Sequence, residues 1–122
     1  MVRTKGLTHI HLAVRDVERS LRFYTEVLGM EERFRHGPGM VFLNTPGSDD
    51  LITLNENPDA AEVAGTSGGI GHFGFRLEPP ADVDRLVAEV EAAGGRLLRR
   101  GEHAVGVPFV FVADPDGYVI EF

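Results

Sequence analysis

The sequence contains no cysteine, and it has fewer basic residues than acidic ones. Without cysteine the chain has no disulfide, no thiolate metal ligand and no cysteine nucleophile, so any metal must be held by His, Asp or Glu. The 19 Asp and Glu residues outnumber the 12 Lys and Arg residues, which gives a formal net charge of −7. An acidic surface without a basic stripe repels polyanions, and we therefore expect no nucleic-acid partner.

Long apolar segments are also absent from the sequence. No run approaches the roughly 20 residues that a membrane-spanning helix needs, so we expect no membrane partner. Thr8, His9 and His11 interrupt the apolar stretch near the N-terminus, which therefore does not resemble a secretory signal. By default we expect a cytoplasmic protein. The 122 residues, of which 43% are hydrophobic, suffice for one domain with a core of its own.

The chain contains an internal repeat. Its two copies open with Gly6-Leu7-Thr8-His9 and Gly69-Ile70-Gly71-His72, and each opening is followed by an alternating run and a helical segment. Each copy then continues with an apolar strand, a proline turn and a short closing strand. These strands are expected at residues 41–44 and 51–55 in the first copy and at 110–113 and 118–122 in the second. Overlaying the two copies places Thr53 opposite Glu121.

Both helical segments have recognisable ends. The first is expected over residues 17–28 with Asp16 as its N-cap, and the second over residues 81–93 with Asp82 as its N-cap. An Asp side chain at this position accepts a hydrogen bond from a free N–H group of the first turn, and a glycine follows each segment. Each segment carries an apolar stripe at helical spacing, so we expect each to pack on a sheet.

These patterns predict an α+β fold built from two β-α-β-β-β units. The first unit covers about residues 6–55 and the second about residues 69–122, and a connection at about residues 56–68 joins them. Each unit is too small to fold well alone. We therefore expect a single domain over residues 1–122.

Alternation along the strands gathers a set of polar side chains on one face. Because successive side chains of a strand point to opposite faces, the apolar positions are expected to pack beneath the two helices. The opposite face is short of lysine and rich in groups that bind metals or anions. Its polar members are His9, His11, His72, Arg76 and Glu121.

Two imidazoles and one carboxylate form a donor set that suits a divalent first-row cation. We therefore predict that His9, His72 and Glu121 bind one metal ion. A lone His on a strand is commonly structural, but three such residues at equivalent repeat positions favour a site. His11 is either a general acid or base or a solvated side chain. Arg76 either contacts an anionic group of the substrate or extends to the solvent at the rim of the site.

At these residues the chain resembles the vicinal oxygen chelate superfamily, which includes glyoxalases, extradiol dioxygenases and bleomycin-resistance proteins. The motifs lie at residues 7–16, at Ser20-Leu21-Arg22-Phe23-Tyr24 with Leu28-Gly29, at Gly71-His72 and at residues 114–121. The resemblance implies an open, U-shaped mixed β-barrel or sheet around the metal, with the helices on its outer face, and a homodimer. It also implies the same three metal ligands, whereas a fourth, a Glu in many glyoxalases, falls on Thr53.

The first functional hypothesis is a metal-dependent enzyme that acts on a small molecule with adjacent oxygens. A dioxygenase using Fe2+ ranks first, and a lyase or isomerase using Mn2+, Zn2+ or Ni2+ ranks second. Thr53 in place of a carboxylate leaves the site more cationic, which makes a true glyoxalase less expected.

The alternative is a non-catalytic protein that binds a small molecule such as an antibiotic. Four aromatic residues would then stack on the ligand, although core or dimer packing explains them as well: Phe34, Phe42, Phe109 and Phe111. His36, near a glycine-rich turn, and His103, near a strand end at the mouth of the site, are weaker candidates for a role.

Overall fold

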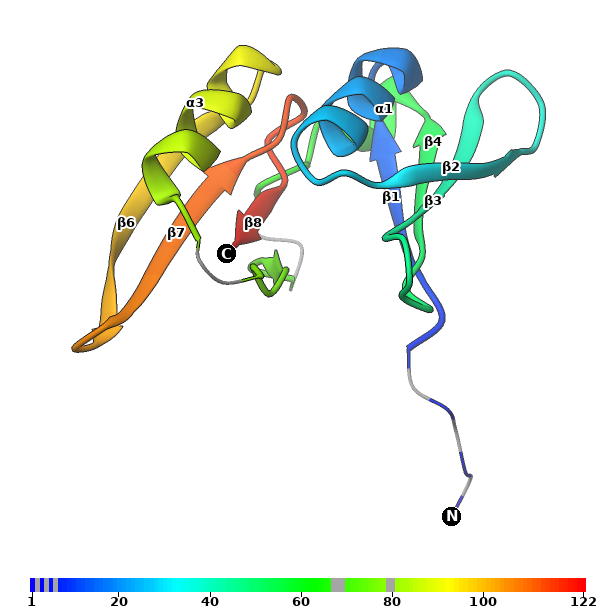
Figure 1. Ribbon diagram of the computed structural model, residues 1–122. Coiled ribbons are helices and arrows are strands. Elements are labelled where there is room, and N and C mark those ends of the chain that lie inside the picture. Colours follow the sequence, from blue (N-terminus) through cyan, green and yellow to red (C-terminus); the bar gives the residue numbers. More distant parts are fainter. Residues whose placement is uncertain (2, 4, 6, 67–69, 79–80) are drawn as a thin grey trace.

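The protein folds into two four-stranded sheets that lie side by side, each with a helix on one face (Figure 1). The computed structural model spans residues 1–122 and describes all of them except residues 2, 4, 6, 67–69 and 79–80. The repeat openings at Gly6 and Gly69 therefore lie outside the described residues. Every helix within the described residues is too short or too polar to span a membrane.

The first sheet, sheet A, has the strand order β1-β4-β3-β2, and the second, sheet B, has the order β5-β8-β7-β6. The strands of sheet A are β1 (Ile10–Val14), β2 (Glu31–Arg35), β3 (Met40–Asn44) and β4 (Ile52–Glu56). Those of sheet B are β5 (Phe73–Gly74), β6 (Arg96–Ala104), β7 (Val107–Ala113) and β8 (Val119–Glu121). Helix α1 (Val17–Glu26) covers sheet A, α3 (Val83–Ala92) covers sheet B, and the short α2 (Pro58–Ala61) lies in the connection.

Both sheets have the same connectivity. In each, the first strand pairs in parallel with the last, and the last pairs antiparallel with the strand that precedes it. A helix forms the connection after the first strand, which completes a β-α-β-β-β unit. The two sheets stay separate and close into no barrel within the described residues. The predicted α+β fold is confirmed.

The helix boundaries follow from their caps. The side chain of Asp16 accepts a hydrogen bond from the N–H of Arg19 at 2.9 Å, and that of Asp82 accepts one from Arg85 at 3.0 Å. Helix α1 ends two residues before the predicted boundary, at Glu26. Helix α3 begins only at Val83, because its N-cap has an extended backbone. The predicted caps are therefore confirmed, while the predicted ranges were slightly too long.

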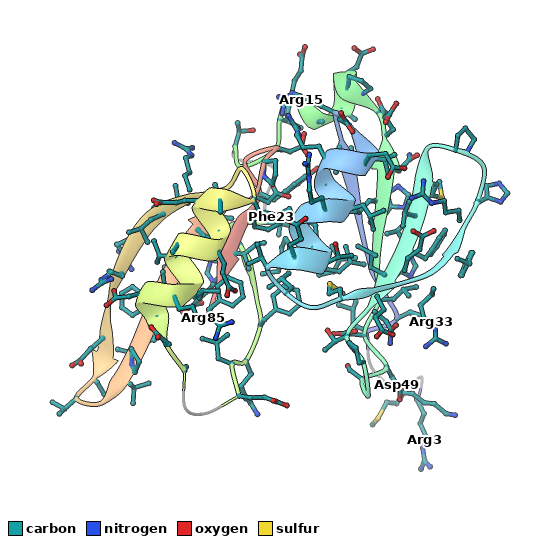
Figure 2. The ribbon with its side chains drawn as sticks, turned by 45° about the horizontal axis from the view of Figure 1, so that its top comes forward. Arg3, Arg15, Phe23, Arg33, Asp49 and Arg85 are labelled. Atoms are coloured by element: carbon teal, nitrogen blue, oxygen red, sulfur yellow. The ribbon has the colours of Figure 1, made fainter. Side chains whose placement is uncertain are left out.

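The hydrophobic core lies between each helix and the apolar face of its sheet, and it continues between the two halves. Phe23 of α1 lies on the side of this helix that is turned toward α3 (Figure 2). Gly95, after α3, leaves room for that ring, because a Cβ at this position would approach the Phe23 ring to 2.7 Å and the Ala113 carbonyl oxygen to 2.6 Å. A side chain at position 95 would therefore force these neighbouring groups to shift.

The buried carboxylate of Asp116 joins the second half to the first. Its oxygens accept hydrogen bonds from the Arg15 backbone N–H at 2.9 Å, the Arg19 guanidinium at 3.0 Å and the Ser20 hydroxyl at 3.0 Å. Arg15 also forms an ion pair with it at 3.3 Å. These groups belong to the start of α1, whereas Asp116 lies in the turn before β8. This turn thus connects the two halves.

Asp114, in the same turn, is the second buried carboxylate at this junction. One of its oxygens accepts hydrogen bonds from the backbone N–H groups of Asp116, Gly117 and Tyr118, each at 2.9 Å. The other accepts a hydrogen bond from the Tyr24 hydroxyl of α1, also at 2.9 Å. Burial raises the pKa of Asp114 from 3.8 to about 6, although the hydrogen bonds from Tyr24 and the backbone act in the opposite direction.

Candidate metal centre

The open face of sheet B, opposite α3, carries most of the polar groups of the predicted site. Along β7, Val110 and Val112 are buried beneath the helix, while Phe109 and Phe111 alternate with them and point to the open face. Glu121 of β8 pairs in register with Phe111, so its side chain lies on the same open face. The β6–β7 hairpin projects away from the rest of the molecule (Figure 1).

Glu121 contacts two imidazoles. Nε2 of His72, which immediately precedes β5, lies 3.0 Å from Oε2 of Glu121. Nε2 of His103, on β6, lies 2.8 Å from Oε1 of the same carboxylate. The structure therefore brings together two of the three predicted metal ligands and adds a second histidine. From the sequence, His103 was only a weaker candidate, because a bulge between Glu102 and Ala104 shifts the alternation near it.

These imidazoles also favour the ionised form of Glu121. The hydrogen bond from His103 lowers the pKa of the Glu121 carboxyl below its ordinary value, and His72 lowers it further. The side chain retains 25% of its exposure, so the carboxylate is open to solvent and to a ligand. At neutral pH it is ionised, which is the form that binds a cation.

His9 lies immediately before β1, on the face of sheet A that is turned away from α1. It lines a cavity of about 550 Å³ together with His11 and His72. The rest of the lining is largely apolar, with Leu7, Val63, Ile70 and Phe73 among its members. Within the described part of the chain, however, no three His, Asp or Glu side chains come close enough together to hold a metal ion. Within one chain, His9 and His72 therefore line the same cavity, but the described residues form no three-ligand metal site.

The other two predicted site residues are exposed. His11 pairs in register with Thr53 of β4 and lines the same cavity as His9. Arg76 follows β5 on the surface, and it forms no hydrogen bond or ion pair with any residue that the structure describes. Neither side chain contacts Glu121.

Thr53 occupies the position in sheet A that Glu121 occupies in sheet B. Phe42 pairs with Thr53 just as Phe111 pairs with Glu121, which agrees with the overlay of the two repeats. The Thr53 residue is only 1% exposed, and its hydroxyl oxygen has no hydrogen-bond partner among the described residues. The first half therefore has a buried neutral hydroxyl at the position where the second half has an accessible carboxylate.

Aromatic side chains accompany the polar groups on both open faces. Phe34 stacks on Phe42 with ring centroids 4.2 Å apart, and Phe34 is 55% exposed. On sheet B the rings of Phe109 and Phe111 meet edge to face at 5.5 Å. The four phenylalanines therefore lie on the surfaces that a small ligand could reach, and they are absent from the buried core.

Comparison with known proteins places these features in a family context. The sequence model of the Glyoxalase/Bleomycin resistance protein/Dioxygenase superfamily matches residues 6–122. The resemblance to the vicinal oxygen chelate proteins seen in the motifs is thereby confirmed.

Individual relatives include a lyase and a dioxygenase. A lactoylglutathione lyase of Haemophilus influenzae is 32% identical over 95% of this chain and 90% of its own length. A catechol-2,3-dioxygenase of Bacillus subtilis is 32% identical over 93% of this chain but only 40% of its own length. The chain likewise spans 35% to 42% of the plant lactoylglutathione lyases that it matches. Among solved structures, a glyoxalase-related enzyme from Fulvimarina pelagi is 28% identical, with a TM-score of 0.72 and coverage of 97% of this chain and 86% of that one.

Proposed function

The chain belongs to the Glyoxalase/Bleomycin resistance protein/Dioxygenase superfamily, and on this basis we propose that it is a divalent-metal-dependent enzyme acting on a small substrate with adjacent oxygens. The observation that carries the proposal is the contact of His72 with Glu121 on an open face, beside a cavity that His9 also lines. Its relatives include both a lyase and a dioxygenase. The reaction is therefore proposed to be an oxidation by dioxygen or a lyase or isomerase reaction.

The residues proposed to hold the metal are His9, His72 and Glu121. Neutral imidazole nitrogens and an ionised carboxylate fit Fe2+ first, and Mn2+, Zn2+ or Ni2+ as alternatives. When bound, the cation would act as a Lewis acid that lowers the pKa of substrate oxygens. One carboxylate leaves a divalent cation with a net charge of about +1, and the neutral hydroxyl of Thr53 does not change it. Such a centre favours substrates that bind through ionised oxygens.

We further propose that the third ligand comes from a second copy of the chain. The hydrogen bonds of Asp116 and Asp114 fix the two halves relative to each other, and in this arrangement no three-ligand group forms among the described residues. In a two-fold homodimer, His72 and Glu121 of one subunit would be completed by His9 of the partner subunit. Each dimer would then contain two equivalent sites.

Two residues are proposed to act on the substrate. His11 lines the same cavity as His9 and His72, where its imidazole can act as a general acid or base. The exposed guanidinium of Arg76 can contact an anionic part of a substrate. Neither role requires a direct contact with the metal.

Metal analysis tests the proposed function. Protein purified without chelator is expected to contain about one divalent ion per chain, and calorimetric titration of the metal-free protein is expected to give the same stoichiometry. His72→Ala should lose this binding. His36→Ala, at an exposed turn that lies apart from the site, should retain it. Metal content near zero in careful preparations of the wild type would contradict the proposal.

Mixing two variants tests the shared site. At a metal concentration that loads neither His9→Ala nor Glu121→Ala alone, an equal mixture that exchanges subunits should regain about a quarter of the sites, because half of the dimers then carry one intact site. His72→Ala mixed with Glu121→Ala should regain none, since both ligands belong to the same half. Equal behaviour of the two mixtures would argue against a shared site.

The exposed stack of Phe34 on Phe42 favours a second candidate function. Two parallel rings on an open sheet face can bind a planar small molecule without any metal, as a binding or antibiotic-resistance protein would. Ligand binding that a chelator leaves unchanged, without turnover of the ligand, would support this candidate over the enzyme.

A further inference from the structure

Arg99 lies in line with Glu121 on the open face of sheet B. In register, Arg99 of β6 pairs with Phe111 of β7, and Phe111 pairs with Glu121 of β8. Neighbouring strands are about 4.8 Å apart, so the backbones of Arg99 and Glu121 are separated by about 10 Å. A substrate bound at Glu121 thus needs to extend only by the length of a small ring to reach the guanidinium.

Two aromatic rings hold the guanidinium of Arg99 in place. Its central carbon lies 5.0 Å from the centroid of the Phe109 ring and 5.3 Å from that of the Phe111 ring. Such stacking restricts an otherwise mobile side chain and leaves the edge of the guanidinium free to donate hydrogen bonds. Gly101 makes this arrangement possible, since a Cβ there would approach the Phe109 ring to 3.0 Å.

The same rings contact the histidines of the proposed centre. His103 packs against Phe109 with centroids 4.4 Å apart, and His72 meets Phe111 edge-on at 5.0 Å. Phe109 and Phe111 therefore form a continuous platform from Arg99 to the groups that hold Glu121. Both rings of this platform come from β7, and the side chains that pack on it come from β6 and from the segment just before β5.

Arg99 has no anionic partner in the part of the chain that the structure describes. Both oxygens of Glu121 are already engaged by imidazoles. The neighbouring Arg100 pairs with Asp84 at 2.6 Å, whereas no described carboxylate lies within ion-pair distance of Arg99. An arginine held on aromatic rings and lacking a partner is suited to bind an anion from solution.

We propose that Arg99 binds a carboxylate or similar oxyanion of the substrate, and so selects substrates that carry such a group about one ring away from the oxygens that chelate the metal. The inference rests on the proposed function for the position of those oxygens. The anion itself would be recognised through two parallel N–H donors of the guanidinium. Substrates with a neutral group at this position would bind less tightly.

Benzoate and benzamide test the anion site without any metal. In the metal-free protein, titration followed by the backbone 1H–15N signals of β6 and β7, which the variants retain, is expected to show binding of benzoate in preference to the neutral, equally large benzamide. Arg99→Gln should weaken benzoate binding about tenfold and leave benzamide unchanged. Arg100→Gln removes the same charge from the next residue and should change neither, provided that both variants retain the wild-type circular dichroism spectrum.

The same comparison in the metal-loaded protein uses 3,4-dihydroxybenzoate and catechol, which share their adjacent oxygens. The preference for the carboxylated compound should disappear in Arg99→Gln while the metal content stays at the wild-type level. Equal preference in Arg99→Gln and wild type, an equal loss in Arg100→Gln, or no benzoate binding by the wild type would overturn the inference. Metal content is measured independently, so a protein that discriminates through Arg99 but holds no metal would refute the proposed enzyme alone.

Discussion

The two sheets have the same connectivity and register, yet their open faces differ in chemistry. At the central position sheet A has Thr53, which is buried and whose hydroxyl has no hydrogen-bond partner among the described residues. Sheet B has Glu121 there, which is accessible and contacts two imidazoles. The neighbouring phenylalanine is covered by another ring in sheet A and supports an arginine in sheet B. A duplicated backbone can thus keep its geometry while ligand-binding groups concentrate on one copy.

The turns before the last strands of the two sheets also differ in their charged groups. In sheet A the turn after β3 is held by neutral groups and by Asp50, whose partly exposed carboxylate accepts from the Thr45 N–H at 2.7 Å. In sheet B the corresponding turn buries two carboxylates, Asp114 and Asp116. Charge is therefore buried mainly in the second half, and this difference leads to measurable effects.

The largest effect is expected when Glu121 of sheet B is replaced by threonine, the residue at the equivalent position of sheet A. Glu121→Thr removes the carboxylate of the proposed site, and the affinity for a divalent metal should fall about a thousandfold or more. Replacing a residue that only hydrogen-bonds to a metal ligand typically lowers the affinity about 10- to 100-fold. Calorimetric titration measures it. Glu102→Gln, an exposed change on β6, serves as control, and wild-type affinity in Glu121→Thr would remove this residue from the site.

The connection between the halves can be broken at Asp116. Asp116→Ala leaves the Ser20 hydroxyl and the Arg15 and Arg19 donors without their buried acceptor, and the free energy of unfolding should fall by about 3 kcal/mol. Urea denaturation measures the loss. Asp49→Ala, on the exposed turn of sheet A, should change stability by less than about 0.5 kcal/mol. Equal losses would mean that the two turns do not differ in this respect.

The buried Asp114 should make stability depend on pH. Because folding raises its pKa from 3.8 to about 6, its protonated form favours the folded state below pH 4, and this contribution is lost as pH rises through 6. Asp114→Asn keeps the backbone hydrogen bonds and removes the titration. The stability of the wild type relative to this variant should therefore fall by about 2 kcal/mol between pH 4 and pH 7.

Unfolding experiments at several pH values measure that difference, and the carboxyl 13C shift of Asp114 gives its pKa directly. A difference between wild type and Asp114→Asn that stays constant from pH 4 to pH 7 would contradict the prediction.

The smallest effect is expected at Thr53. Thr53→Val has nearly the same shape and removes a buried hydroxyl for which the described part of the chain offers no partner, so stability should increase by about 0.5 to 1 kcal/mol. Thermal denaturation measures the change. Thr53→Ser, which keeps the hydroxyl and loses a methyl group, should instead lower stability by about 1 kcal/mol. A loss of stability in Thr53→Val would show that this hydroxyl does have a partner.

Much of the fold could be predicted from local sequence patterns. The caps Asp16 and Asp82 act within one turn of their helices, so their role follows from neighbouring residues alone. The alternation of β7 and β8 places Phe111 and Glu121 on one face for the same reason. His103 was predicted only as a weaker candidate and Arg99 was not predicted, because a register shift and the pairing between strands decide which residues they contact.

By itself, the sequence determined the repeat, the elements and the face on which each candidate ligand lies, since helix capping and strand alternation depend on near neighbours. Only the tertiary structure decided which groups meet. Glu121 contacts His72 and His103, and Asp116 forms hydrogen bonds with residues at the start of α1. His9 lines a cavity with His72 but forms no three-ligand group with the described residues. The physical reason is that contacts between strands and between halves depend on register and packing over the whole chain, which no local pattern encodes.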